Sequence, residues 1–292
     1  INFFIDKKIK VKKLIILSRD ELKQSEMREK YSTKKYKFLR YFIGDIRDKE
    51  RLRFAFRDVD IIVHAAALKQ VPSAEYNPTE YIKTNIIGAQ NIIECALESN
   101  KVSRVLALST DKAVLPINLY GATKLCSDKL FISANRIKGS RDLRFGVLRY
   151  GNVMMSRGSV IPIFLSSKKK YFTVTDKEMT RFSLTLDDSV NAAFYAIRNI
   201  KGGEIIIPKA KSYKITDLAH SIDNKKKIKI VGIRPGEKLH EVLICKSDAQ
   251  FTYENKEYYI IKENLKDKNK LKGFKKVKKD FQYSSNLNKF LT

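Results

Sequence analysis

Short apolar runs alternate with longer amphipathic stretches along the first half of the chain. The apolar runs predict buried strands at 13–18, 38–44, 61–67, 105–110 and 145–150. The stretches between them predict helices at 20–31, 49–56 and 79–99. Strands that are apolar throughout and alternate with helices indicate a parallel sheet covered on both faces. We therefore predict an α/β fold with a doubly wound, Rossmann-like parallel sheet.

The helix predicted at 79–99 has a single apolar stripe. The stripe consists of Ile82, Ile86, Ala89, Ile93 and Ala96, which recur at helical spacing. We expect this stripe to face the sheet.

After Gly151 the predicted elements become shorter and turns become frequent, although 189–199 still has helical periodicity. We place a domain boundary here, with a nucleotide-binding domain over 1–152 and a smaller α/β region over 153–292. No glycine-rich loop of the kind that lets backbone amides approach a pyrophosphate precedes the first predicted strand. We expect the chain to begin partway through the helix that follows such a loop, with the first strand of the sheet missing.

The charge of the chain is its most unusual bulk property. Lys and Arg number 59 against 32 Asp and Glu, a formal net charge of +27, which attracts polyanions. The lysines are spread along the chain, without the interleaved aromatic residues of a strand-binding groove. We favour a solvated basic surface and no nucleic-acid partner. A nucleic-acid binder remains the alternative, and it predicts a steep salt dependence of affinity.

Neither a membrane span nor a metal site is visible in the sequence. No run of eighteen apolar residues and no secretory signal pattern occur, so we expect a cytoplasmic protein with no membrane partner. Cys95, Cys126 and Cys245 are odd in number and lie far apart, so we expect buried free thiols and neither a disulfide framework nor a metal centre.

The stretch 109–124 carries the candidate chemistry. Asp111 and Lys112 follow a predicted strand, at the sheet edge where open α/β folds hold ligands. Tyr120 and Lys124 stand four residues apart, so in a helix both lie on one face. A nearby ammonium favours the phenolate and lowers the pKa of a tyrosine, which suits proton transfer. Alone, Tyr-x-x-x-Lys is typical of a solvated helix face, but its place after the Ser-Thr-Asp-Lys strand end favours catalysis.

Eight motifs in order resemble one known family. They are Ser18-Arg-Asp-Glu21, Gly44-Asp-Ile-Arg-Asp48, His64-Ala-Ala-Ala-Leu-Lys-Gln-Val-Pro72, Glu75-Tyr-Asn-Pro78, Thr84-Asn85, the stretch 109–124, Arg149-Tyr-Gly-Asn152 and Arg234-Pro-Gly-Glu-Lys-Leu-His-Glu241. From about residue 13 to the tail, the chain resembles the inverting UDP-N-acetylglucosamine 4,6-dehydratases, which are extended short-chain dehydrogenase/reductases. Related membrane-anchored dehydratases typically carry Met where Tyr120 stands, so Tyr120 favours the inverting branch.

The resemblance implies a redox-neutral reaction on a UDP-sugar. NADP+ would oxidise C4 of the hexose while Tyr120, assisted by Lys124, accepts the hydroxyl proton. Lys112 would then remove the C5 proton and Asp111 would protonate the departing C6 hydroxyl. As a base, Lys112 needs a pKa well below about 10.4, through burial or a neighbouring cation. The alternative for Lys112 is a salt bridge with Asp111.

The resemblance also implies a set of binding residues. Those expected at the cofactor are Ser18, Arg19, Asp45, Ile46, Ala65, Ala66, Lys69, Thr84, Asn85, Tyr120 and Lys124. A basic fork at Arg19 suits a 2′-phosphate and favours NADP over NAD. Those expected at the substrate are Lys69, Thr110, Asn152, Arg157, Arg234 and Glu237. For the segment Arg234-Pro-Gly-Glu237, a β-turn with a surface ion pair remains the alternative.

Two positions depart from the family pattern, because Met155 and Ser183 stand where we expect a glycine and a bulky aromatic residue. The resemblance predicts dehydration of UDP-N-acetylglucosamine to a UDP-4-keto-6-deoxy-hexosamine with inversion at C5, by a homo-oligomer, for pseudaminic-acid-type surface or flagellin sugars. A non-inverting 4,6-dehydratase, a 4-epimerase of UDP-sugars and a catalytically impaired truncated remnant remain alternatives.

Overall fold

The computed structural model describes residues 1–156, 158–262 and 271–291. The strands are β1 (Leu14–Ser18), β2 (Leu39–Ile43), β3 (Ile61–His64), β4 (Arg104–Thr110), β5 (Arg144–Tyr150), β6 (Asn152–Val153), β7 (Tyr171–Val174), β8 (Thr180–Leu184), β9 (Glu204–Pro208), β10 (Lys211–Lys214), β11 (Lys227–Ile230), β12 (Val242–Ile244), β13 (Thr252–Glu254), β14 (Tyr258–Lys262), β15 (Lys275–Lys276) and β16 (Tyr283–Ser284). The helices are α1 (Asn2–Asp6), α2 (Glu21–Lys30), α3 (Lys49–Ala55), α4 (Val71–Tyr76), α5 (Pro78–Tyr81), the π-helix η1 (Ile82–Ile87), α6 (Gly88–Glu98), the 3-10 turn η2 (Asp111–Ala113), α7 (Leu119–Ile137), α8 (Val160–Ser166), α9 (Leu186–Asn199), α10 (Ile215–Ile222) and α11 (Lys246–Ala249).

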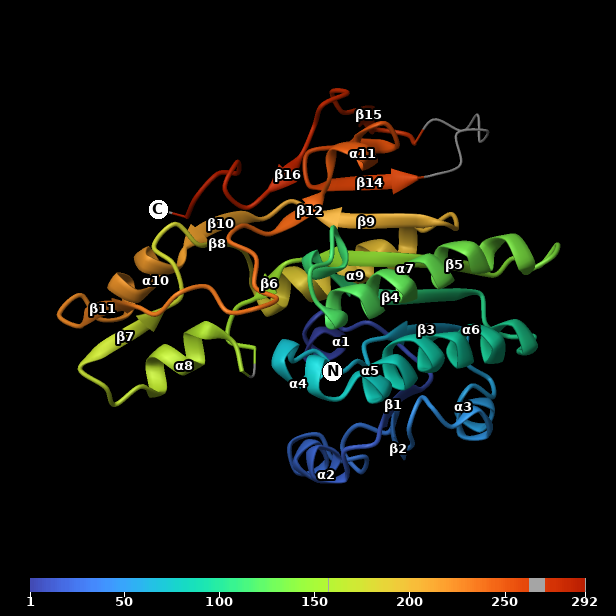
Figure 1. The fold of residues 1–292 in the computed structure, drawn as a ribbon. Coiled ribbons are helices and arrows are strands. Elements are labelled where there is room, and N and C mark those ends of the chain that lie inside the picture. Colours follow the sequence, from blue (N-terminus) through green and yellow to red (C-terminus); the bar gives the residue numbers. More distant parts are fainter. Residues whose placement is uncertain (157, 263–270, 292) are drawn as a thin grey trace.

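The largest sheet has seven strands in the order β15-β13-β14-β9-β5-β4-β3 (Figure 1). β3, β4, β5 and β9 run parallel, and β14, β13 and β15 add antiparallel strands at the far edge. The predicted α/β fold with a parallel Rossmann-like sheet is therefore confirmed.

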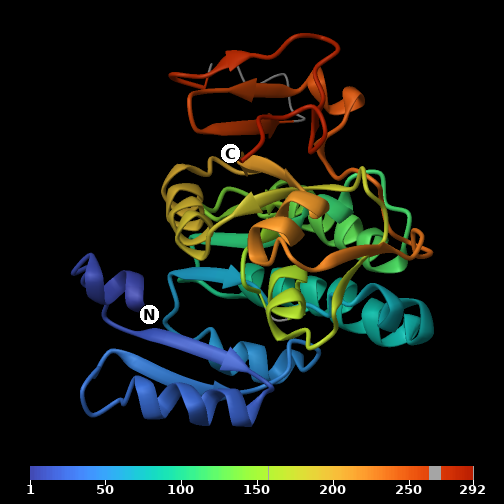
Figure 2. The same ribbon diagram turned by 90° about the vertical axis from the view of Figure 1, so that its left-hand side faces the viewer.

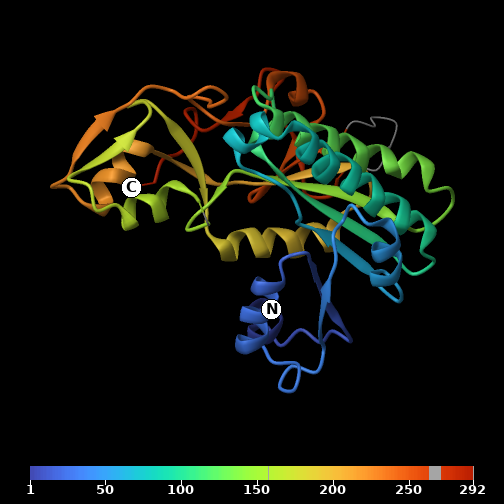
Figure 3. The same cartoon turned by 60° about the horizontal axis from the view of Figure 1, so that its bottom comes forward.

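Helices cover both faces of this sheet. Val105 and Val147 pack with Phe131 of α7, whereas Leu106 and Leu148 pack with α9. Side chains of successive strand residues point to opposite faces, so the continuous apolar runs of β4 and β5 supply both layers. Figure 3 shows α9 on the face opposite α6 and α7.

The sheet is divided at one place. β1 and β2 form a separate parallel pair, and β3 is the edge of the seven-stranded sheet (Figure 2). When β2, β1 and β3 are matched to strands 3, 2 and 4 of a doubly wound sheet of order 3-2-1-4, strand 1 of that order lies between β1 and β3. β1 is apolar yet contains no fully buried residue, and Ile61 and Val63 of β3 are 46% and 45% exposed. The apolar side chains of β1 and β3 therefore remain partly exposed to solvent near the edges at which these two strands do not pair.

The seven-stranded sheet continues beyond residue 152, because β9, β13, β14 and β15 all follow it in the chain. The region after 152 also has a core of its own, in which β7, α8 and α10 pack around Phe164 and Phe172. Figure 1 shows this group beside the main sheet, at the end toward which β4 and β5 point.

The helix predicted at 79–99 consists of α5, η1 and α6, and its predicted stripe is partly wrong. Ala89, Ile93 and Ala96 are buried, but Ile82 is 41% exposed, and Thr84 and Asn85 are buried instead. A π-helix adds one residue per hydrogen-bonded turn, which rotates the preceding residues around the helix axis. The apolar spacing alone gives no sign of this rotation.

The expected free thiols are only partly buried. Cys95 is buried, but Cys126 is exposed and Cys245 is half-buried. Cys126 lies on the outer side of α7, and no described element covers its side chain fully.

Candidate active site

The turn η2 joins β4 to the segment that leads into α7, and it carries Asp111 and Lys112. The Asn118 side chain caps α7 by accepting a hydrogen bond from the Gly121 amide at 2.7 Å. Gly121 then packs directly on η2, because a Cβ at this position would lie 2.2 Å from the carbonyl oxygen of Lys112. This close approach brings Tyr120 of α7 beside the Thr110-Asp111-Lys112 turn.

Asp111 is fully buried. Its Oδ1 accepts hydrogen bonds from Thr110 Oγ1 at 3.0 Å and from Lys112 Nζ at 2.9 Å, whereas its Oδ2 has no partner among the described residues. Burial raises the pKa of Asp111, and the Lys112 ammonium opposes this only in part. A raised pKa makes a carboxyl group take up a proton more readily, which suits the role of a general acid.

Lys112 lies between two carboxylates. Its Nζ is 2.9 Å from Asp111 Oδ1 and 3.2 Å from Glu241 Oε1. Burial lowers the pKa of Lys112, but the charges of Asp111 and Glu241 outweigh burial, so the net pKa is raised. The lowered pKa that Lys112 needs as a base is thus absent from the ligand-free protein, and the alternative salt bridge with Asp111 is present.

Tyr120 and Lys124 are both buried on the inner face of α7. Burial raises the pKa of Tyr120 to about 12, while Lys112 and a hydrogen bond with the Thr110 side chain act to lower it. Lys124 donates a hydrogen bond from Nζ to the Leu108 carbonyl at 2.9 Å, and burial lowers its own pKa. Lys112 is therefore the main cation that acts on the pKa of Tyr120.

A buried polar group supports the strand beneath the site. Ser109 Oγ donates to Asp128 Oδ2 at 2.8 Å, and Arg149 Nη2 lies 3.2 Å from the same oxygen. Strand alternation directs Ser109 into the core while Thr110 reaches Asp111 and Tyr120. Ser109 thus anchors α7 through Asp128.

The residues expected at the adenosine end of a cofactor follow β1 and β2. Arg19 Nη1 lies 3.4 Å from Asp45 Oδ2, and half of the Arg19 side chain is exposed. Burial would raise the pKa of Asp45, but hydrogen bonds from Arg47 and Arg19 outweigh burial and lower it. Ser18 Oγ accepts a hydrogen bond from the Asp20 amide. Ser18, Arg19 and Asp45 are thus brought together at one sheet edge.

The other expected cofactor residues differ in their exposure and in whether their polar groups already have partners. Ala65 and Ala66 are exposed after β3, and Lys69 is exposed in the loop that follows. The Thr84 hydroxyl is buried without a partner in the described part of the chain.

Two predicted cofactor residues, Ile46 and Asn85, make contacts that hold neighbouring elements together. Ile46 is buried beside Gly88 of α6. Asn85 binds both backbone groups of Leu68 at 2.9 Å and donates to Thr123 Oγ1 at 3.0 Å, so its amide fastens the loop after β3 to α7.

The predicted substrate residues are only partly brought to the Asp111 turn. Thr110 belongs to it, and Gly151 lies next to it, since a Cβ there would be 3.2 Å from Asp111 Oδ2. Asn152 follows directly, and its Oδ1 is buried without a partner among the described residues. Arg157 lies outside the described residues.

Arg234 and Glu237 form an exposed ion pair across the turn at Gly236, as the alternative interpretation of that segment predicted. Asn118 Nδ2 donates to the Gly236 carbonyl at 2.8 Å, which ties this turn to the start of α7. A pocket of about 550 Å³ lies at this junction, between Pro116–Asn118 and Pro235–Gly236.

The two departures from the family pattern have different structural contexts. Met155 has a φ of 60°, a left-handed conformation in which glycine is unstrained, so the expectation of glycine there has a conformational basis. Ser183 is half-buried on β8 and pairs with Asn152 of β6.

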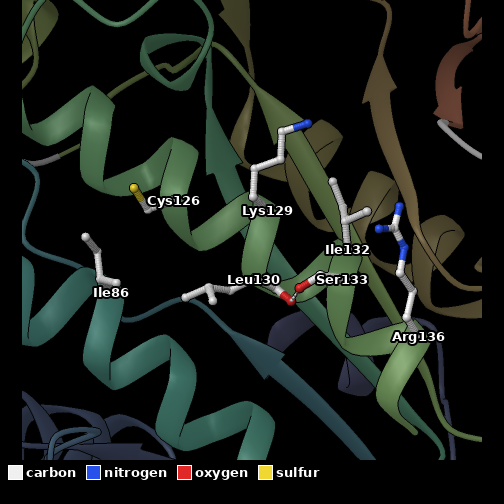
Figure 4. Close-up of a pocket in the computed structure, with 7 residues that line it drawn as sticks. All are labelled: Ile86, Cys126, Lys129, Leu130, Ile132, Ser133 and Arg136. Atoms are coloured by element: carbon white, nitrogen blue, oxygen red, sulfur yellow. Dashed lines mark hydrogen bonds between the residues drawn. The ribbon is translucent and has the colours of Figure 1, made fainter. Parts of the chain in front are cut away.

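A second pocket lies away from this chemistry. It measures about 410 Å³ and lies between η1 and the outer face of α7 (Figure 4). Its lining residues are Ile86, Cys126, Lys129, Leu130, Ile132, Ser133 and Arg136, none of which is a predicted site residue. In the described ranges, no cluster of His, Cys, Asp and Glu could hold a metal ion, and no helix has the length and apolar character needed to cross a bilayer.

Glu241 lies in a motif that the sequence analysis identified, but that analysis gave this residue no role in the site. It is 2% exposed and touches Lys112 across the cluster. The only sequence signal is its place at the end of the Arg234–Glu241 motif, directly before the apolar strand β12.

Known proteins resemble the chain over most of its length. A protein of Campylobacter jejuni subsp. jejuni serotype O:2, named UDP-N-acetylglucosamine 4,6-dehydratase (inverting), is 53% identical over 96% of this chain and 86% of its own length. The UDP-glucose 4-epimerase of Rickettsia canadensis is 42% identical over 90% of this chain and 78% of its own length. The crystal structure of Pen from Bacillus thuringiensis superposes with a TM-score of 0.91 at 35% identity, covering 99% of this chain and 90% of that one.

The profile of one protein family, described as polysaccharide biosynthesis protein, matches residues 4–263. This match spans the parallel strands of the Rossmann-like sheet and the Asp111–Lys112–Tyr120 cluster. The chain therefore belongs to the polysaccharide biosynthesis protein family.

Proposed function

We propose that this protein dehydrates UDP-N-acetylglucosamine to a UDP-4-keto-6-deoxy-hexosamine with inversion at C5. The observation that carries the proposal is the cluster of buried Asp111 and Tyr120 with half-buried Lys112 at the carboxyl end of β4. The name of the 53% identical Campylobacter jejuni relative supports the same reaction.

A nicotinamide dinucleotide fits the residues at the strand ends. Ser18, Arg19, Asp45 and Ile46 would hold its adenosine end; Ala65, Ala66, Lys69, Thr84 and Asn85 would line the rest. The half-exposed guanidinium of Arg19 suits a 2′-phosphate, so we propose NADP as the cofactor. When bound, it supplies the reversible removal and return of a hydride.

Tyr120 accepts the proton of the C4 hydroxyl in this mechanism. With a pKa of about 12 in the ligand-free protein, Tyr120 is a phenol at neutral pH and must first lose its own proton. The Thr110 hydroxyl lies between Tyr120 and Asp111, because Thr110 donates to Asp111 Oδ1 at 3.0 Å. A proton that passes along this chain leaves Tyr120 as phenolate and Asp111 as a neutral acid.

Asp111 and Lys112 then carry out the elimination. Once C4 is a ketone, its carbonyl acidifies the C5 hydrogen, and Lys112, after releasing its own ammonium proton to solvent, removes this hydrogen as a proton. The C6–O bond breaks as Asp111 donates its proton to the departing hydroxyl, so water leaves and a C5–C6 double bond forms. The raised pKa of Asp111 suits the donor role.

A 4-epimerase is the second candidate, because the 42% identical Rickettsia canadensis relative carries that name. Epimerisation at C4 requires proton transfer only at the C4 oxygen. It would give the Asp111–Lys112 pair no chemical role, although the pair lies at the centre of the cluster. We therefore favour dehydration.

The test is NMR of the protein with UDP-N-acetylglucosamine and NADP in deuterated buffer. We expect a 4-keto-6-deoxy product with deuterium at an inverted C5. Asp111→Asn and Lys112→Met should each abolish it, whereas Lys101→Met, at an exposed position before β4, should not. Appearance of UDP-N-acetylgalactosamine instead would establish the epimerase.

Cofactor choice has its own test, by calorimetry with NADP and with NAD. A charged hydrogen bond contributes about 1.5–3 kcal/mol, so Arg19→Ala should weaken NADP binding by roughly ten- to a hundredfold and leave NAD binding nearly unchanged. Equal loss for both cofactors would remove Arg19 from the 2′-phosphate site.

The proposal extends to the setting of the enzyme. We propose a cytoplasmic homo-oligomer that supplies pseudaminic-acid-type sugars for surface or flagellin glycosylation. Light scattering coupled to size-exclusion chromatography measures the oligomeric state, and a monomer would contradict that part.

A further inference from the structure

Glu241 occupies a position that no part of the mechanism above uses. It ends the segment after the Arg234 turn and precedes β12, about 130 residues from Lys112 in the chain, yet its Oε1 lies 3.2 Å from Lys112 Nζ. The same carboxylate lies 3.8 Å from Arg181 Nε on β8, while Oε2 is buried without a partner among the described residues. A carboxylate so deeply buried is costly unless it is paired.

The backbone of Glu241 is held as firmly as its side chain. The Glu241 amide donates to Ser285 Oγ at 2.9 Å, and the Glu241 carbonyl accepts from the Ser285 amide at 2.8 Å. Ser285 is itself buried and its hydroxyl lies 2.7 Å from Thr180 Oγ1 on β8. The chain near its C-terminal end therefore fixes the distance between Glu241 and Lys112.

The ionisable groups around this pair come from several elements. They are Asp111 and Lys112 on η2, Tyr120 on α7, Arg181 on β8, Tyr213 on β10, and Lys238 and His240 before β12. The two carboxylates in contact with the Lys112 amine are Asp111, from this set, and Glu241 itself. When Asp111 is protonated, Glu241 is the remaining anion that touches the Lys112 amine.

We propose that Glu241 is the positioning residue for Lys112, which it orients toward the substrate and stabilises as the ammonium that forms during C5 deprotonation. The role rests on the proposed dehydration and corresponds to that of the aspartate in a Ser-His-Asp triad, which orients a base and stabilises its protonated form. In the step itself, the C5–H bond breaks and an N–H bond forms on Lys112. Asp111 gives its proton to the leaving hydroxyl in the same step, so its charge changes during the reaction. Glu241 gives up no proton in this step, so it can stabilise the Lys112 ammonium throughout.

The first experiment measures the protonation of Lys112 without any reaction. Lysine side chains are labelled with ¹³C at Cε, the Lys112 resonance is assigned by its loss in Lys112→Arg, and the signal is followed through a pH titration. Glu241→Gln keeps the shape of the side chain and removes its charge. We expect the midpoint of Lys112 to fall by at least one pH unit in Glu241→Gln, and an unchanged midpoint would overturn the proposal.

The second experiment compares kinetics across pH. Because Lys112 must be neutral to act, the ascending limb of kcat should move to lower pH in Glu241→Gln by a similar amount. The plateau of kcat should fall by ten- to a hundredfold, with KM changed less than threefold. Glu50→Gln, a matched change on the exposed surface of α3, should leave both profiles unchanged.

A purely structural role for Glu241 gives a different result. Ser285→Ala removes the acceptor of the Glu241 amide without changing charge, so it should lower kcat and leave the ascending limb where it is. If Glu241→Gln behaves like Ser285→Ala, the carboxylate only holds the fold and the proposal fails. If the unsubstituted protein makes no 4-keto-6-deoxy sugar while the Lys112 midpoint still shifts, the proposed reaction fails and the contact between Glu241 and Lys112 stands.

Discussion

Burial controls the ionisation of individual side chains around β3, β4 and α7. It raises the pKa of Asp111 and Tyr120 and lowers that of Lys124 and His64. In each case desolvation favours the uncharged form. Lys112 is the exception, because two carboxylates touch it. Burial thus favours the protonated forms of Asp111 and Tyr120, whereas the two carboxylates favour the charged form of Lys112.

His64 gives this effect a measurable consequence for stability. Its ring is buried beside Phe131, and burial together with the charge of Lys124 lowers its pKa to about 3, against about 6.5 in an unfolded chain. Between these values the unfolded chain binds a proton that the folded chain does not. The free energy of unfolding therefore falls with decreasing pH, by about 2 kcal/mol between pH 7 and pH 5.

Replacement of His64 by Gln should remove this part of the pH dependence, as measured by urea unfolding at pH 7, 6 and 5. His220→Gln, at an exposed position on α10, should keep the original dependence. An equally steep decline in His64→Gln would show that His64 does not titrate as described.

For individual residues, the sequence predicts which side chains form the Asp111–Lys112–Tyr120 cluster better than it predicts their charge. Asp111, Lys112 and Tyr120 lie within ten residues of each other and next to a strand end, so local sequence places them together. Glu241 and Arg181 reach Lys112 only through the tertiary fold. The pKa of Lys112 depends on Glu241, and therefore no local pattern could give its direction.

Among the elements, the contact between α7 and η2 sets the geometry of the site. α7 carries Tyr120 and η2 carries Asp111 and Lys112, and Gly121 is the residue at which the two backbones meet. The N-cap at Asn118 fixes where α7 begins. A side chain at position 121 would separate the two elements.

Gly121→Ala tests this contact. Alanine favours a helix interior over glycine by about 1 kcal/mol, so propensity alone predicts a more stable protein. The Cβ would lie 2.2 Å from the Lys112 carbonyl oxygen, and overpacking of this kind costs about 1–3 kcal/mol. We expect lower stability and a roughly hundredfold loss of turnover from misplacement of η2.

Thermal unfolding and turnover of Gly121→Ala are compared with Ser133→Ala on the exposed side of the same helix. Ser133→Ala should be neutral or slightly stabilising. A stabilised and fully active Gly121→Ala would refute the account of the contact.

The elements themselves differ in how far sequence could define them. Asp48 caps α3 as its position before the helix predicts, by accepting from the Arg51 amide at 2.9 Å. The π-helix η1 could not be predicted, because one additional residue in a turn does not change the number of apolar residues in the segment. Its effect is to bury Thr84 and Asn85, and Asn85 then joins the loop after β3 to α7.

Of the five sheets in the described residues, the seven-stranded sheet and the β1–β2 pair together hold the strands predicted in the first half of the chain, and they contribute unequally to the core. The seven-stranded sheet is covered by α6 and α7 on one face and α9 on the other, whereas the β1–β2 pair reaches the main core mainly through the partly buried Leu17 and Phe42. The alternation of strands and helices predicts these strands, but as parts of one parallel sheet. It could not predict that pairing stops between β1 and β3.

Hydrogen exchange should distinguish the two sheets. We expect the amides of β1 and β2 to exchange much faster than those of β4 and β5, because segments with few buried contacts open at lower free energy than the core. Mass spectrometry of peptic fragments measures both sets in one experiment. Equal protection would mean that the pair opens only when the whole protein unfolds.

Local opening of this kind has a cost for ligand affinity. Ser18, Arg19 and Asp45 stand at the ends of β1 and β2, so any molecule held by them binds only the fraction of chains in which the pair is closed. The observed dissociation constant then equals the intrinsic one divided by that fraction. Substitutions that rigidify β1 and β2 should tighten binding at Arg19 even where they touch no ligand atom.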